Sequence, residues 1–385
     1  MTETLYLVRY GEMFLKSDSV LKYFTSKLKN DLEEKIKING IQAKVITFRD
    51  RLYIKIKEDE SKRIENILLN TFGVHSFSLA YKLETTDLGE IESFIKEQYK
   101  GYISLEDTFA IRASKSSKQS YSTMDMGKTL GNLFNGIVDL SNPKKEICVE
   151  VKEKETLVYT STQKGLGGLP VGSSGKILML ISGGIDSPVA SFLMNKRGCE
   201  NIFLHFHSFP LVSRNSINKV KELVKLLTKY QNKIKLILLP FSEIQNHIKA
   251  LTEPKYRIVL YRRSMLRLAN EIALSENLKI LASGEALGQV SSQTLDNMYT
   301  ISEASTLPIL RPLICFDKIE IIDLAKKIGT YETSIQPQED TCTLFTPKHP
   351  TTQADLETIK KIEENIGILE KEKEALTKLE YCDIF

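Results

Sequence analysis

The sequence has few cysteines and no long apolar segment. Its five cysteines are odd in number and include no C-x-x-C pair, which argues against the disulfide framework of a small secreted protein and against a closed zinc site. No stretch approaches the roughly 18 consecutive apolar residues that a membrane helix needs. Polar residues also interrupt the first apolar segment, unlike in a signal peptide. We therefore expect a cytoplasmic protein with no membrane partner, in which any important cysteine acts alone.

An excess of charge of one sign is also missing. The 385 residues include 53 basic and 49 acidic ones, so a nucleic-acid surface can arise only from local clusters of basic residues. Hydrophobic residues at 42% and charged residues at 26% are ordinary values for a soluble globular protein. The chain is longer than one compact core requires, and we expect two or three domains.

The first 165 residues combine short strands with amphipathic helices, which predicts two small α+β modules. The predicted strands are 4–9, 43–48, 52–57, 107–113, 146–152 and 156–162. The predicted helices are 19–38, 61–70, 87–99 and 122–135.

A glycine-rich stretch, 165–175, follows these modules, and its small apolar content predicts an unpacked linker. Beyond it, apolar strands alternate with helices, which predicts a parallel sheet covered on both faces. The predicted strands are 176–181, 201–206, 233–239, 278–283 and 307–310. The predicted helices are 187–197, 216–230, 242–251, 256–275 and 317–328. The charged tail, 353–380, is predicted to be a solvated helix.

The segment KILMLISGGIDSP, residues 176–188, joins the first of these strands to a helix through a tight turn. Pro188 falls in the first helical turn, where proline is tolerated best. The unpaired N–H groups and the positive dipole end of the helix favour an anion, so the turn is a candidate phosphate cradle. The alternative is an ordinary strand–helix connection with Ser182 or Ser187 as the helix cap, which leaves the rest of the motif unexplained.

The run S-G-G-x-D-S resembles the PP-loop of ATP pyrophosphatases, which split ATP between its α and β phosphates. Further motifs are HFHS (205–208), YRRSMLR (261–267), SGEALGQVSSQT (283–294), RPLICFDKIEI (311–321) and EDTCTLF (339–345). Together they resemble the tRNA 4-thiouridine synthetase family, whose members act on the uridine at tRNA position 8. The resemblance implies a ferredoxin-like domain at 1–60, a THUMP RNA-binding domain at 61–165, a linker at 166–175 and a Rossmann-like α/β PP-loop domain at 176–385.

The resemblance also implies a set of functional residues. The expected ATP-binding residues are Leu180, Ile181, Ser182, Gly183, Gly184, Ser187, His205, Phe206, Arg262, Arg263, Gly284 and Gln293. Asp186 is expected to aid Mg²⁺ binding or the reacting geometry, and Lys318 to neutralise charge on the phosphates. Cys342 matches the family's catalytic cysteine and needs a cation nearby, for which Arg311 or Lys318 could serve. The alternative for Cys342 is a buried structural thiol.

A separate set of basic residues is expected to contact RNA. These residues lie in IRASKSSKQS and in the NPKK segment, where small hydroxyl side chains and few acids accompany the charges. They are Arg112, Lys115, Lys118, Lys144 and Lys145. A solvated loop without RNA contact is the alternative.

The predicted function is ATP-dependent tRNA sulfur transfer, in which uridine O4 is adenylated and a Cys342 persulfide supplies sulfur. The cofactors are ATP and Mg²⁺, and the partners are tRNA, a second copy of the chain and a cysteine desulfurase. Longer family members carry a rhodanese-like domain, whereas this sequence ends at Phe385, so we expect direct loading of Cys342 or the use of free sulfide. Two alternatives stay open: a PP-loop enzyme that modifies another substrate without sulfur transfer, and an RNA-binding module without activity.

Overall fold

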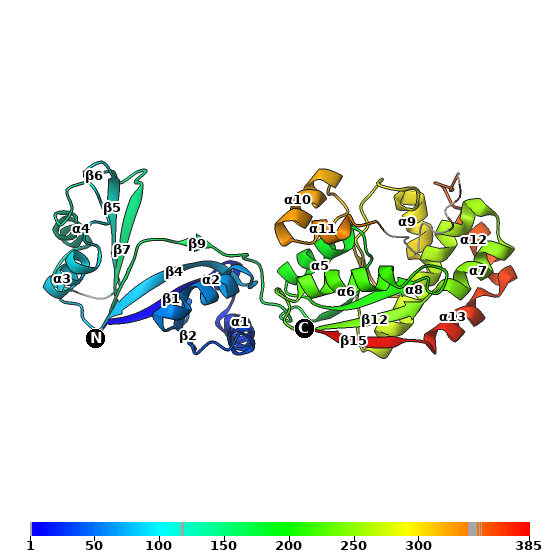
Figure 1. Cartoon of the computed structure of the whole chain (residues 1–385), viewed down its shortest axis with the longest axis horizontal. Coiled ribbons are helices and arrows are strands. Elements are labelled where there is room, and N and C mark those ends of the chain that lie inside the picture. Colours follow the sequence, from blue (N-terminus) through cyan, green and yellow to red (C-terminus); the bar gives the residue numbers. More distant parts are fainter. Residues whose placement is uncertain (1, 117–118, 338–344, 346, 348) are drawn as a thin grey trace. The chain divides into compact units, whose positions relative to one another are not determined.

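The computed structural model describes residues 2–116, 119–337, 345, 347 and 349–385. Lys118 and Cys342 therefore lie outside the described residues. The chain divides into two compact units, Met1–Leu169 and Pro170–Phe385 (Figure 1). No helix among the described residues is long and apolar enough to span a membrane.

One continuous antiparallel and parallel sheet organises the N-terminal unit. The strand order is β2-β3-β1-β4-β8-β7-β5-β6, and β9 pairs with β4 outside this path. The strands are β1 (Thr2–Tyr10), β2 (Lys44–Thr47), β3 (Arg51–Lys55), β4 (Val74–Leu83), β5 (Thr108–Lys115), β6 (Ile137–Val138), β7 (Lys145–Val151), β8 (Thr156–Tyr159) and β9 (Gln163–Lys164). The sequence did not predict β4, because its buried positions do not alternate simply. This strand joins the two modules by pairing with β1 and with β8.

Each module has its own helices and its own core. Helices α1 (Asp18–Ile38) and α2 (Ser61–Leu69) bury apolar residues such as Leu28 and Ile64 with β1 and β3. Helices α3 (Leu88–Gln98) and α4 (Thr123–Gly131) bury a second cluster that includes Ile91 and Met126. Two cores in one sheet agree with the predicted pair of α+β modules.

The glycine-rich stretch is packed at its beginning, contrary to our expectation. The backbone N–H of Gly165 bonds to the carbonyl oxygen of His75 at 2.9 Å, and Leu169 is buried in the core of α1 and α2. A Cβ at Gly165 would lie 2.3 Å from the carbonyl oxygen of Val74, so only glycine allows this approach to β4. In this stretch, glycine permits close packing against β4 and is not present for backbone flexibility alone.

A six-stranded sheet forms the centre of the C-terminal unit, in the order β14-β13-β10-β11-β12-β15. The strands are β10 (Lys176–Leu180), β11 (Glu200–His207), β12 (Ile234–Pro240), β13 (Leu281–Ala282), β14 (Ile309–Leu310) and β15 (Glu380–Ile384). The first five strands in this order are parallel to their neighbours, as predicted, and β15 pairs antiparallel with β12. The predicted α/β fold with a parallel sheet is thus confirmed, with an added antiparallel edge.

Helices form two groups around this sheet. One group is α5 (Asp186–Lys196), α6 (Asn215–Leu227), α10 (Lys318–Ile328) and α11 (Tyr331–Ser334). The other group is α7 (Ser242–Leu251), α8 (Arg257–Ser275), α9 (Leu295–Ser302), α12 (Leu356–Ile366) and α13 (Ile368–Leu376). Figure 1 shows α5 and α6 beside α10 and α11, and α7 beside α12 and α13.

The tail is not the solvated helix that its charge suggested. Gly367, with a φ of 61°, separates α12 from α13, and β15 follows. Ile359 and Ile368 are buried against α7 and α8, while the Glu372 carboxylate accepts a hydrogen bond from Arg267 at 2.6 Å. Apolar residues at helical spacing bury one face of the tail although the tail is rich in charged residues.

Candidate active site

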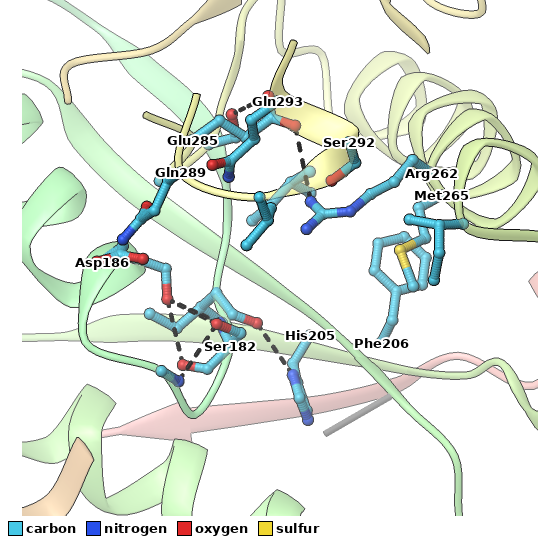
Figure 2. A pocket seen from close by; sticks show the side chains of 18 of the residues that line it. Ser182, Asp186, His205, Phe206, Arg262, Met265, Glu285, Gln289, Ser292 and Gln293 are labelled. Atoms are coloured by element: carbon cyan, nitrogen blue, oxygen red, sulfur yellow. Dashed lines mark hydrogen bonds and ion pairs between the residues drawn. The ribbon is translucent and has the colours of Figure 1, made fainter. Parts of the chain in front are cut away.

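A cavity of about 430 Å³ lies at the carboxyl ends of β10, β11 and β13 (Figure 2). Ligands of parallel α/β sheets bind at this edge, because the strand-to-helix loops meet there. Most of the predicted ATP residues line the cavity: Leu180, Ile181, Ser182, Gly184, Ser187, His205, Phe206, Arg262, Gly284 and Gln293. Asp186 and Lys318 also line it.

The turn between β10 and α5 folds back on itself through two serines. The Ser182 backbone N–H donates to the Ser187 hydroxyl at 2.9 Å, and that hydroxyl donates to the Ser182 carbonyl oxygen at 3.2 Å. The Gly184 N–H lies 3.4 Å from the Ser182 hydroxyl oxygen. These bonds wrap the turn around the beginning of α5, where the helix dipole favours an anion. The turn therefore has the form of a phosphate cradle.

Gly284, which follows β13, lies directly against this cradle. A Cβ at Gly284 would be 2.8 Å from the Ser187 backbone nitrogen and 2.8 Å from its Cα. Real Cβ atoms do not come so close to backbone atoms, so only glycine fits at this position. The absence of a side chain brings the 283–293 loop over the cavity.

An ion pair connects the cradle to a second loop. The Lys318 ammonium lies 2.6 Å from an Asp186 carboxylate oxygen, and both side chains are partly exposed. Lys318 begins α10, and the capping box of Asp317 and Glu320 fixes this helix end. The predicted catalytic pair thus meets at the cavity wall.

Helix α11 follows α10 in the chain, and its last residue also contacts the cradle. The Ser334 hydroxyl donates to the Gly184 carbonyl oxygen at 3.4 Å. On α6, the Lys219 ammonium donates to the carbonyl oxygens of Ser334 at 2.9 Å and Gln336 at 2.7 Å. The segment α10–α11 is therefore held to the phosphate cradle at its beginning and at its end.

Charged residues form one wall of the cavity (Figure 2). A Glu285 carboxylate oxygen lies 3.7 Å from the Arg262 guanidinium, and the other accepts a hydrogen bond from Arg311 at 2.7 Å. Burial raises the pKa of the Glu285 carboxyl, but the charges of Arg262 and Arg311 outweigh burial and hold this pKa below its ordinary value. Glu285 is therefore ionised at neutral pH.

The cavity also offers surface for a planar base. Phe206 and Met265 give it apolar surface, and the His205 ring nitrogen Nδ1 lies 3.0 Å from the Ile181 carbonyl oxygen. The Gln293 side-chain oxygen is buried and has no hydrogen-bond partner among the described residues. An unsatisfied amide oxygen in a cavity is suited to accept a hydrogen bond from a ligand.

Two expectations need correction. Arg263 does not face the cavity: its guanidinium is 3% exposed and pairs with Glu303 and Glu363, both at 3.0 Å. Successive helical residues point about 100° apart, so Arg262 and Arg263 of α8 face different surroundings. Arg311, considered as a cation beside Cys342, donates a hydrogen bond to Glu285 at 2.7 Å, and Cys342 itself lies outside the described residues. Gly183 is not among the residues that line the cavity.

Sequence reasoning missed several cavity residues. They are Leu204, Ile258, Met265, Ser283, Glu285, Gln289, Val290, Ser291 and Ser292. Seven of these lie within the motifs already quoted, and a signal for the loop residues was their place near Gly284. Ile258 carried no signal, because an apolar helical residue is more often core than binding site.

The basic residues expected to contact RNA differ in how their charges are used. Arg112 pairs with Glu146 at 2.7 Å, and Lys145 pairs with Asp107 at 2.8 Å. The Lys115 ammonium donates to the Tyr121 carbonyl oxygen at 2.6 Å, while Lys144 is exposed. Lys115 and Lys144 therefore keep more of their charge for a ligand than the two paired residues do.

Comparisons with known proteins agree with this arrangement. Family models match a ferredoxin-like domain at 5–78, a THUMP domain at 85–161 and a family described as thiamine biosynthesis protein (ThiI) at 172–368. A probable tRNA sulfurtransferase of Oceanobacillus iheyensis is 38% identical over 98% of this chain and 95% of its own length.

Solved structures agree as well. A crystal structure of a 4-thiouridine synthetase–RNA complex with bound ATP has a TM-score of 0.88 and 32% identity, with 100% of both chains covered. PH1313 from Pyrococcus horikoshii has a TM-score of 0.63 over 85% of this chain and 99% of its own, and its 21% identity shows a shared fold only. The family resemblance predicted from the motifs is thus confirmed, and the chain belongs to the ThiI family.

Proposed function

We propose that this protein is an ATP-dependent tRNA sulfurtransferase that forms 4-thiouridine at position 8 of tRNA. The proposal rests above all on the phosphate cradle of Ser182–Ser187, which closes one side of a cavity large enough for a nucleotide. It is supported by relatives named as a probable tRNA sulfurtransferase and as a 4-thiouridine synthetase that binds RNA and ATP. The RNA-modifying protein would act in the cytoplasm.

The cavity residues fit ATP in charge and in shape. The cradle and Ser187 would bind the β and γ phosphates, and Arg262 and Lys318 would neutralise their charge. The backbone of Leu180–Ile181 and the side chains of Phe206 and Gln293 would surround the nucleoside. Asp186 is the candidate to hold Mg²⁺, because oxygen ligands are the ones that Mg²⁺ prefers. On binding Mg²⁺, the Asp186 carboxylate would give up its ion pair with Lys318.

The chemistry has two steps. In the first, the uridine O4 attacks the α-phosphorus of ATP and pyrophosphate leaves, which converts O4 into a good leaving group. In the second, the terminal sulfur of a Cys342 persulfide attacks C4 and AMP leaves. A thiol then attacks the Cys342 sulfur of the remaining sulfur–sulfur bond, which releases the thiolated base. A second thiol reduces the mixed disulfide left on Cys342, which restores the Cys342 thiol and leaves a disulfide of the two thiols.

Binding of partners belongs to the same proposal. Arg112, Lys115, Lys118, Lys144 and Lys145 would contact the backbone of folded tRNA, whose shape is read more readily than its base sequence. A cysteine desulfurase would load Cys342 with sulfur. A homodimer would let the N-terminal unit of one subunit present tRNA to the cavity of the other.

A reconstituted reaction tests the function. The full chain, unmodified tRNA, Mg-ATP, a cysteine desulfurase, cysteine and a reducing thiol are incubated, and the tRNA nucleosides are analysed by mass spectrometry. We expect 4-thiouridine with the wild-type protein and none with Cys342→Ser, because serine cannot carry a persulfide. Cys315→Ser is the matched control: Cys315 is an exposed free cysteine, and this variant should keep the activity.

The two halves of the reaction are separated by a second measurement. Cys342→Ser should still release pyrophosphate when tRNA is added, because adenylation does not use the thiol. Undiminished 4-thiouridine in Cys342→Ser would eliminate Cys342 as the sulfur carrier. Pyrophosphate release at the same rate with and without tRNA would favour a PP-loop enzyme with a different substrate.

A further inference from the structure

An acidic side chain lies inside the cavity proposed for a negatively charged nucleotide. Glu285 lines the cavity and is 6% exposed. A carboxylate at this place repels phosphate, and the repulsion is stronger in a water-poor cavity than at the surface. Its presence therefore calls for a role other than direct contact with the phosphates.

The partners of Glu285 indicate that role. One carboxylate oxygen accepts hydrogen bonds from Arg311 at 2.7 Å and from the Ser283 hydroxyl at 2.9 Å. Arg311 is held in turn by the Ser302 hydroxyl at 2.7 Å. The carboxylate is thus fixed on one side by short hydrogen bonds, which keep its other oxygen turned toward Arg262.

The contact with Arg262 is of a different kind. At 3.7 Å it is longer than a hydrogen bond, so Glu285 attracts the Arg262 guanidinium without a short bond to this oxygen. The carboxylate also separates two like charges that would otherwise repel each other. Arg262, unlike Arg311, lines the cavity.

We propose that Glu285 is a positioning residue that holds the Arg262 guanidinium in the cavity in the orientation that binds the phosphates of ATP. Arg311 and Ser283 fix the Glu285 carboxylate, and Glu285 orients Arg262 by charge. The inference rests on the proposed use of ATP. It predicts that the effect of Glu285 on nucleotide affinity passes through Arg262.

The test is a double-mutant cycle on the full chain, with the Kd of Mg-ATP measured by isothermal titration calorimetry without tRNA. Glu285→Gln should raise the Kd on the order of tenfold, and Arg262→Ala should raise it at least as much. The double variant should differ from Arg262→Ala by less than about twofold, because Glu285 has nothing left to orient. Glu285→Asp, which keeps the charge, should recover part of the affinity.

A matched control distinguishes positioning from general stability. Glu372 is also a buried carboxylate paired with an arginine, 5% exposed and 2.6 Å from Arg267, and it does not line the cavity. Glu372→Gln should lower the Tm and leave the Kd of Mg-ATP within about twofold of wild type, since its loss disturbs packing alone. Ser283→Ala, which removes one hydrogen bond to Glu285, replaces Glu285→Gln if that variant does not fold, with an expected rise in Kd of about threefold.

The outcomes are distinct. A wild-type Kd in Glu285→Gln, or effects of Glu285→Gln and Arg262→Ala that multiply in the double variant, would overturn the positioning role while the proposed function stands. Failure of the wild-type protein to bind Mg-ATP would overturn the proposed function and this inference together.

Discussion

Single residues determine how closely the loops around the cavity approach each other, and Gly284 is the tightest case. A side chain there meets the backbone of Ser187 and Asp186 at 2.8 to 3.0 Å. We expect Gly284→Ala to destabilise the protein by about 1–3 kcal/mol, as overpacking usually does. The displaced cradle should also weaken Mg-ATP binding on the order of tenfold.

Urea unfolding and calorimetric titration measure the two effects of Gly284→Ala. Gly127→Ala is the control, because a Cβ at Gly127 in α4 meets nothing within 4 Å. Alanine in a helix is favoured over glycine by about 0.5–1 kcal/mol, so this variant should be slightly more stable. Equal ATP affinity in Gly284→Ala and wild type would show that the cradle tolerates the shift.

Residue-level prediction from the sequence succeeded where chemistry is encoded locally. Ser182, Gly184, Ser187 and the charges Asp186 and Lys318 were expected at one site and meet there. The sequence could not separate Arg262 from Arg263, because the difference depends on Glu303 and Glu363, which lie far away in the chain. Glu285 was overlooked for the same reason: its role depends on Arg311 and Arg262 from other elements.

At the scale of helices and strands, α6 stabilises the end of α11 through one buried ammonium. Lys219 is 7% exposed and donates to two backbone carbonyl oxygens, of Ser334 and Gln336. Lys219→Met leaves these carbonyls without that donor, and an unsatisfied buried acceptor costs about 1–3 kcal/mol. We expect a loss of this size in the free energy of unfolding measured with urea.

Lys225→Met is the control for Lys219→Met, because Lys225 is an exposed lysine on the same helix. It should change the free energy of unfolding by less than about 0.5 kcal/mol. If the two variants are equally stable, the contact between α6 and α11 contributes nothing to stability.

Elements differ in how far the sequence reveals them. The five parallel strands and the helices α5 to α8 have apolar runs and amphipathic patterns of their own and were predicted, whereas α9, between β13 and β14, was not. β4 and β15 were not, because each exists through pairing with distant strands: β4 with β1 and β8, and β15 with β12. Pairing of this kind leaves no local periodicity to read.

At the scale of the whole molecule, tRNA binding must depend on small clusters of charge, since the net charge is only +4. Lys115→Ala/Lys144→Ala should weaken tRNA binding and make the plot of log K against log salt concentration shallower by about one unit per lost phosphate contact. Filter binding at several salt concentrations measures this slope.

Lys373→Ala is the control for the RNA variants, because Lys373 is exposed on α13 of the C-terminal unit. Its slope should equal that of wild type. An unchanged slope in Lys115→Ala/Lys144→Ala would place the RNA contacts on other residues of the chain.

The attachment of α10–α11 at both of its ends means that this segment cannot shift without disturbing the turn that forms the cradle. Lys318 at one end touches Asp186, Ser334 at the other touches Gly184, and the sequence reaches Cys342 shortly after Gln336. A ligand that draws Asp186 away from Lys318 would act on one end of a segment whose other end rests on the cradle backbone, so the two helices would have to shift together or stay in place.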